Sequence, residues 1–257
     1  MIPSLAPCFT GIFIHYKDAL ALPGEHKSFI QGRDLLDPIV MESLLSRFAG
    51  AHVGGDRRAI VSMWTQWHFG ALIIPTAAAI LFLEHDLPVE LDHVGIAVDD
   101  SGKTAAIILP DLAASEHACA GERFSRLFQG HVEPLIRKLA GQFKVSPRLL
   151  WNNASDIFEW TLLQANSIGT ARSDALSEGH ALLKSKIGSN GRPNPMFDLV
   201  RYLPQGDQTI RQRKLCCLRY LLPGVECCGS LCPTPPPKVP KAEEKGHTDQ
   251  GSETAAH

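Results

Sequence analysis

Apolar side chains recur every three or four positions through several long stretches of the chain, which is the spacing of a helix with one buried face. One stretch runs from Pro38 to Gly50, and a second starts at Asp56, a residue suited to capping the first turn. The second continues directly into a fifteen-residue apolar run at 69–83 that contains Pro75. Because a membrane span needs about 18 or more apolar residues, the run predicts a buried core helix and no membrane span.

The second half of the chain continues the helical pattern. Apolar positions keep helical spacing over 124–143, where Pro134 is predicted to kink or restart the helix. Ser146-Pro147 is a cap residue followed by proline, which predicts the start of another helix, and a further one is expected around 175–187. By contrast, two short apolar runs within 94–109 flank a turn sequence and predict a β-hairpin. The expected fold class is α+β, mostly helical with a small antiparallel sheet.

Composition narrows the class of protein. A hydrophobic content of 44% is enough for a sizeable core, and a formal charge of -2 gives no general attraction to nucleic acid or anionic membranes. The first twenty residues lack the features of a secretory signal, so a cytoplasmic protein is expected. The Pro-rich, charged segment 234–257 has too few apolar side chains to fold and is predicted to be disordered.

Five of the seven cysteines fall within seventeen positions, at Cys216, Cys217, Cys227, Cys228 and Cys232. In a reducing compartment such a cluster is more typical of metal binding than of disulfides. Thiolates suit zinc or an iron–sulfur centre. The adjacent pair can share one site only in irregular backbone, because neighbouring side chains of a strand point to opposite faces. It also departs from the C-x₂₋₄-C knuckle of structural zinc sites.

The string CCLRYLLPG, the cysteines after it and the final Cys-Pro resemble the C-terminal signature of the FhuF-type siderophore-iron reductases. In that family Cys-Cys, ten residues, Cys, two residues, Cys holds a [2Fe–2S] cluster. The resemblance implies that Cys216, Cys217, Cys228 and Cys232 are the metal ligands that bind this cofactor. Here the last gap has three residues, and choosing Cys228 over Cys227 keeps the ten-residue gap. The segment WNNASDIFEW at 151–160 is also similar to a family segment.

The resemblance implies a cytoplasmic ferric-siderophore reductase that passes one electron from the cluster to Fe(III) in a hydroxamate-type chelate and releases Fe(II). A ferredoxin, flavodoxin or separate reductase would supply the electron, because the sequence has no nucleotide-binding fingerprint. The implied organisation is a reductase domain at 1–210, a [2Fe–2S] module at 211–233 and a tail at 234–257. Two alternatives stay open: a zinc-stabilised interaction module, and a non-enzymatic iron–sulfur sensor or carrier.

Three further groups of residues have chemistry to consider. Trp64, Trp67 and His68 share one helix face and are interpreted as core, although such a face could contact an organic ligand. The acidic and histidine residues at 84–86 and 92–93 could bind metal, but a solvated helix end and loop explain them better. Four basic side chains surround the first cysteine pair, where they either steer an acidic electron donor and tune the cluster or form a solvated face: Arg211, Arg213, Lys214 and Arg219.

The two remaining cysteines, Cys8 and Cys119, stand alone in the sequence. Isolated free cysteines commonly behave as small buried hydrophobes. Both are therefore predicted to be buried and to take no part in the metal site.

Overall fold

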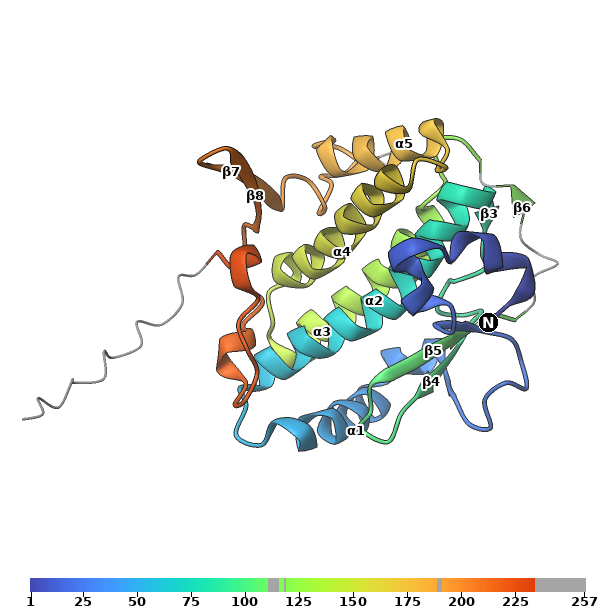
Figure 1. Ribbon diagram of the computed structural model, residues 1–257. Coiled ribbons are helices and arrows are strands. Elements are labelled where there is room, and N and C mark those ends of the chain that lie inside the picture. The colour runs from blue at the N-terminus through green and yellow to red at the C-terminus, as the bar shows by residue number, and fades with distance from the viewer. Residues whose placement is uncertain (111–115, 118, 189–190, 234–257) are drawn as a thin grey trace, which may run out of the picture.

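The computed structural model of the protein describes residues 1–110, 116–117, 119–188 and 191–233 (Figure 1). The tail predicted at 234–257 lies outside these residues. The α+β class is confirmed, and the helical part consists of α1 (Pro38–Ala49), α2 (Arg57–Leu83), α3 (Glu133–Phe143), α4 (Pro147–Ile168) and α5 (Ser173–Lys184).

Helix α2 is the centre of the core. Asp56 caps it as predicted, its carboxylate accepting a hydrogen bond from Arg58 N, and the helix then continues without interruption for 27 residues through Pro75. Most of its side chains from Ala59 to Leu81 are buried. Its length and composition would suffice to cross a membrane, but 67% of its most apolar window is buried inside the protein. That burial is what a core helix shows.

The predicted hairpin within 94–109 is confirmed as β4 (Gly95–Val98) and β5 (Thr104–Ile108). At its turn Asp99 Oδ1 accepts hydrogen bonds from Ser101 N and Lys103 N, at 3.0 and 2.9 Å. The sheet has the order β1-β5-β4-β2 and includes β1 (Leu20–Ala21) and β2 (Ile30–Gln31). It is mixed, because β1 pairs parallel with β5, so the prediction of a purely antiparallel sheet is wrong.

The remaining elements of the helical domain are short. Helix α3 has Pro134 in its first turn and continues directly from a π-helical stretch, so the helix changes type just before this proline without a break. Strands β3 (His85–Asp86) and β6 (Glu116–His117) pair antiparallel. The short helical segments are η1 (Pro3–Cys8), η2 (Gly11–Tyr16), η3 (Gly32–Leu36), η4 (Gly50–His52) and η5 (Arg126–Val132).

A second hairpin, which the sequence pattern does not predict, leads into the cysteines. Strands β7 (Val200–Gln205) and β8 (Gln208–Arg213) pair antiparallel around the two-residue turn at 206–207. The expected domain boundary between 210 and 211 therefore falls inside β8. After β8 the chain is irregular, apart from η6 (Arg219–Leu221) and η7 (Gly229–Leu231).

Candidate metal centre and the cavity beside it

Residues 215–232, which carry the five clustered cysteines and are called the cysteine segment below, lie against the amino-terminal parts of α2 and α4. These two helices begin at the same end of the molecule (Figure 1). Ser62 Oγ in α2 donates a hydrogen bond to the Cys217 carbonyl at 2.7 Å. Leu215 N donates to Asn152 Oδ1 in α4 at 2.9 Å. Asp56 N, at the cap of α2, donates to the Leu221 carbonyl at 3.3 Å. Backbone atoms of the segment are thus tied to both helices.

A buried polar network reinforces this attachment. Asn153 Nδ2 donates to the Ser62 carbonyl at 3.1 Å and to Thr65 Oγ1 at 3.0 Å. Its Oδ1 accepts a hydrogen bond from the Arg213 guanidinium. Arg213 is only 3% exposed and lies 3.8 Å from an Asp156 carboxylate oxygen. A buried guanidinium needs such partners, so the Asn-Asn-Ala-Ser-Asp segment of α4 fixes the path of the chain into the cysteines.

The other basic residues near the cysteines differ in their partners. Arg211 pairs with Asp156 at 2.6 Å and Glu159 at 2.8 Å, and Lys214 pairs with Asp198 at 2.6 Å. The alternative of a solvated basic face is therefore wrong for these two and for the buried Arg213. Arg219 is the exception. In the part of the chain that the structure describes it makes no ion pair, and its terminal nitrogen contacts Gln66 Oε1 at 3.3 Å and Met63 Sδ at 3.9 Å.

Two of the predicted ligands come together directly: Cys217 Sγ and Cys228 Sγ lie 3.8 Å apart. Two thiolates bound at about 2.3 Å to one tetrahedral metal lie about 3.8 Å from each other. Cys232 is close enough to Cys228 to affect its pKa, and Cys216 Sγ accepts a hydrogen bond from Leu218 N at 3.4 Å. Among the described residues no three His, Cys, Asp or Glu side chains form one metal-binding group. The four-cysteine ligand set stays a prediction.

The surroundings of Cys217 favour its thiolate. The hydrogen bond from Cys228 lowers the pKa of Cys217 most, and the charges of Arg213 and Arg219 lower it further. The same contact raises the pKa of Cys228, which keeps its proton. Metals bind the thiolate form, so Cys217 is ready to bind a metal, while Cys228 would release its proton on binding one. Leu218 has a φ of 63°, which confirms the irregular backbone expected beside the vicinal pair.

A cavity of about 480 Å³ opens beside the cysteine segment, within the volume range of small-molecule sites. Trp67 forms part of its wall and is 49% exposed, with Lys103 Nζ 3.9 Å from the ring centroid. The core interpretation is confirmed for Trp64 and His68 and wrong for Trp67. The lining comes from η2, α2, the β4–β5 hairpin, α4 and η6 and includes Tyr16, Met63, Gln66, Trp67, Gly70, Ala71, Ile74, Asp99, Lys103, Thr104, Asp156, Ile157 and Arg219.

Behind the cavity wall lies a pair of fully buried histidines. His131 Nδ1 lies 2.6 Å from the Val89 carbonyl and must donate to it, which leaves His131 Nε2 as an acceptor for His68 Nε2–H at 3.0 Å. His68 Nδ1 then accepts from the Thr104 hydroxyl at 2.9 Å, and Thr104 lines the cavity. Burial lowers the pKa of both histidines, that of His131 to about 4. The sequence pattern predicts His68 as a core residue but gives no sign of its partner His131.

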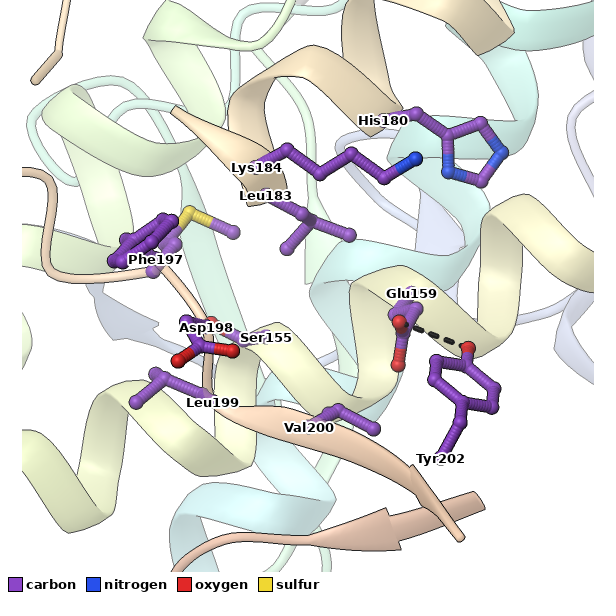
Figure 2. Close-up of a pocket in the computed structure, with 11 residues that line it drawn as sticks. Ser155, Glu159, His180, Leu183, Lys184, Phe197, Asp198, Leu199, Val200 and Tyr202 are labelled. Atoms are coloured by element: carbon purple, nitrogen blue, oxygen red, sulfur yellow. Dashed lines mark hydrogen bonds between the residues drawn. The ribbon is translucent and has the colours of Figure 1, made fainter. Parts of the chain in front are cut away.

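A second cavity, of about 240 Å³, lies between α4, α5 and the start of β7 (Figure 2). Glu159 faces it and accepts a hydrogen bond from the Tyr202 hydroxyl at 3.0 Å, while its other oxygen pairs with Arg211. Glu159 therefore holds the β7–β8 hairpin against α4. This cavity is half the size of the one at Trp67 and borders none of the cysteines.

The remaining sequence expectations have mixed outcomes. Glu84 caps the end of α2 and lies 3.2 Å from Arg172, so the helix end is confirmed but is ion-paired rather than simply solvated. Asp86 pairs with Arg126 at 3.1 Å. Cys8 is buried as predicted, whereas Cys119 is exposed and that prediction is wrong. The π-helical approach to α3 carries His131, which no local pattern marks as polar core.

Comparisons with known proteins give three findings. A family model described as ferric iron reductase FhuF-like transporter matches residues 62–210, a region that ends before the cysteines. The ferric siderophore reductase of Escherichia coli (strain K12) is 28% identical over 178 residues, which cover 68% of this chain and 65% of that protein. The match thus spans slightly less than two thirds of the relative.

The third finding is a structural likeness to the ATP-bound aerobactin synthetase IucA from a hypervirulent pathotype of Klebsiella pneumoniae. The TM-score is 0.53 at 10% sequence identity, over 66% of this chain and 37% of that one. At this identity the likeness shows a shared fold and carries no statement about activity.

Proposed function

The chain belongs to the family described as ferric iron reductase FhuF-like transporter, and from this premise we propose that it is a cytoplasmic ferric-siderophore reductase. The proposed substrate is Fe(III) held in a hydroxamate-type chelate. Hydroxamate oxygens are hard ligands that suit Fe(III) much better than Fe(II). One added electron therefore loosens the chelate and releases the iron. The name of the similar Escherichia coli protein supports this activity.

The thiols of Cys217 and Cys228, 3.8 Å apart, are the observation that carries the proposal. That separation fits two ligands of one tetrahedral centre, and the neighbouring thiols of Cys216 and Cys232 complete a set of four soft donors. These four residues would hold a [2Fe–2S] cluster. When bound, such a cluster supplies electrons one at a time, at a potential set by nearby charges and hydrogen bonds.

The chain's own residues favour negative charge at these sulfurs. Arg213 and Arg219 lower the pKa of Cys217, and Leu218 N donates a hydrogen bond to Cys216 Sγ. Each of these contacts stabilises the more negative, reduced state of a centre bound there. A ferredoxin, a flavodoxin or a separate reductase is the proposed electron donor.

Spectroscopy of the full-length protein, purified anaerobically, tests the proposal. We expect about two irons and two acid-labile sulfides per chain, a red-brown colour, and an EPR signal that appears on dithionite reduction. The reduced protein should then convert a ferric trishydroxamate to Fe(II), measured with a chromogenic Fe(II) trap, while NADPH alone gives no reduction. Stoichiometric zinc in a colourless preparation would instead favour the interaction-module alternative. A reduced cluster that leaves ferric chelates untouched would favour the sensor or carrier.

A further inference from the structure

The large cavity is built on one face of α2 that starts at the cysteine segment. Met63, Gln66, Trp67, Gly70, Ala71 and Ile74 line it, at the spacing of a single helical face. At about 1.5 Å per residue this face is roughly 16 Å long. It begins next to Ser62, which holds the Cys217 carbonyl. The end of this face at Met63 therefore lies beside the cysteine segment, where the Arg219 guanidinium contacts Met63 Sδ at 3.9 Å.

At Gly70 in α2 the cavity has free space where a side chain would otherwise lie. A Cβ placed on this glycine would meet no atom within 4 Å, and its backbone is helical. The side chains around the opening are largely apolar, with the half-exposed indole of Trp67 as the largest. The cavity thus offers an apolar surface to a ligand and room for it.

The charged side chains that line the cavity differ in whether another residue of the protein pairs with them. Asp156 is paired with Arg211 at 2.6 Å, and Asp99 Oδ1 accepts hydrogen bonds within its own turn. Within the described residues neither Lys103 nor Arg219 makes an ion pair, and Arg219 Nε is buried without a hydrogen-bond partner. Asp156 is thus engaged by Arg211. Lys103 has the Asp99 carboxylate as a nearby charge without forming an ion pair, and Arg219 is the cation most available to a ligand.

We infer that this cavity is the docking site of the ferric chelate, and that it prefers chelates that carry a free carboxylate or another negative charge. The inference rests on the proposed function for the identity of the metal. The apolar wall contacts the organic backbone of the chelate. Lys103 and Arg219 pair with its negative charge, and Arg219 follows Cys217 by two residues in the chain.

Binding of redox-inert gallium(III) complexes to the full-length holoprotein tests docking apart from reduction. The probes are gallium(III) complexes of one linear trishydroxamate, either with a free terminal carboxylate or as its terminal amide, titrated by calorimetry. We expect the carboxylate probe to bind about tenfold more tightly than the amide. Lys103→Gln should lower this ratio, because only Arg219 then remains to pair with the carboxylate, whereas Lys27→Gln, an exposed lysine outside the cavity, should leave it unchanged.

A second experiment uses a variant whose new side chain fills the cavity. Gly70→Leu should weaken both probes at least tenfold, because the new side chain occupies the opening. Gly141→Leu is its matched control, since that glycine is also helical, has no atom within 4 Å of an added Cβ and does not line this cavity. Equal affinity of native and Gly70→Leu proteins, or of the two probes for the native protein, would overturn the inference.

The reductase assay keeps this failure separate from a failure of the proposed function. If Gly70→Leu binds the gallium probes as tightly as the native protein, and the native protein reduces ferric chelates, the docking site is refuted and the proposed function is not. Gallium binding that Gly70→Leu abolishes, without any reduction of the ferric probes, supports the docking site and rejects the reductase.

Discussion

Acidification should destabilise the protein through the buried His68–His131 pair. In the folded state both imidazoles are neutral, because His131 donates to the Val89 carbonyl and His68 donates to His131. A proton on His131 Nε2 would place two donors face to face in a fully buried site. Burial accordingly lowers the pKa of His131 from 6.5 to about 4. The unfolded chain therefore binds more protons than the folded one between these two values.

The loss of unfolding free energy on acidification can be calculated from this pKa shift. One pKa unit corresponds to about 1.4 kcal/mol, so the contribution of His131 amounts to about 3 kcal/mol. It is present in full above the unfolded value of 6.5 and is lost as the pH falls to about 4. Between pH 7 and pH 5 the loss from His131 alone is about 2 kcal/mol. The lowered pKa of His68 adds a loss in the same direction.

Urea unfolding followed by far-ultraviolet circular dichroism at pH 5, 6 and 7 measures this loss. His131→Asn removes the titrating ring, so its unfolding free energy should fall by about 2 kcal/mol less than that of the native protein between pH 7 and pH 5. His15→Asn, at an exposed position, is the control and should follow the native curve. Parallel curves for the native and His131→Asn proteins would show that His131 is not held neutral by the fold.

Three further predictions concern the cysteine segment and its attachment. Cys228→Ser should lose or damage the cluster, because the Cys228 thiol lies 3.8 Å from that of Cys217. Cys227 is exposed, so Cys227→Ser should keep the cluster with near-normal EPR spectra. The reverse pattern would contradict this assignment. Arg213→Met should lower the free energy of unfolding by about 3 kcal/mol, since it leaves buried polar partners unsatisfied, and an unchanged urea midpoint would argue against that network. Asp56→Ala should cost about 1 kcal/mol in the same assay by removing the cap of α2, unless Arg58 N finds another acceptor.

The helices could be predicted because their signals are local. Asp56 supplies a side-chain acceptor where α2 begins, and Pro134 lies in the first turn of α3, where its ring geometry is favourable. The turn at Asp99 likewise joins two apolar runs that pair with each other. The hairpin β7–β8 gave no such signal, because its strands are mostly exposed and polar and Pro204 interrupts the first.

The site could be predicted only in part. The cysteine spacing pointed to a metal centre, but the residues that hold it come from segments far apart in the chain. Asn153 lies 60 residues from its partner Arg213. Behind the cavity, His68 likewise lies 63 residues from its partner His131. Two adjacent asparagines inside the buried face of a helix were the available signal for the first pair. Trp67 was assigned to the core because the spacing of an aromatic residue does not reveal whether a neighbouring element covers it.

The attachment of the cysteine segment bears on how the cofactor would be acquired and replaced. The anchors at Ser62, Asn152 and Asp56 use backbone and side-chain oxygen and nitrogen atoms, and none uses a cysteine thiol. A zinc finger, by contrast, folds only when its metal is bound. Here the position of the thiols is set by hydrogen bonds between the cysteine segment and the core, and these bonds do not involve a metal. A chain whose cluster has been destroyed by oxygen would therefore keep its shape and could be reloaded, rather than being lost to unfolding and proteolysis.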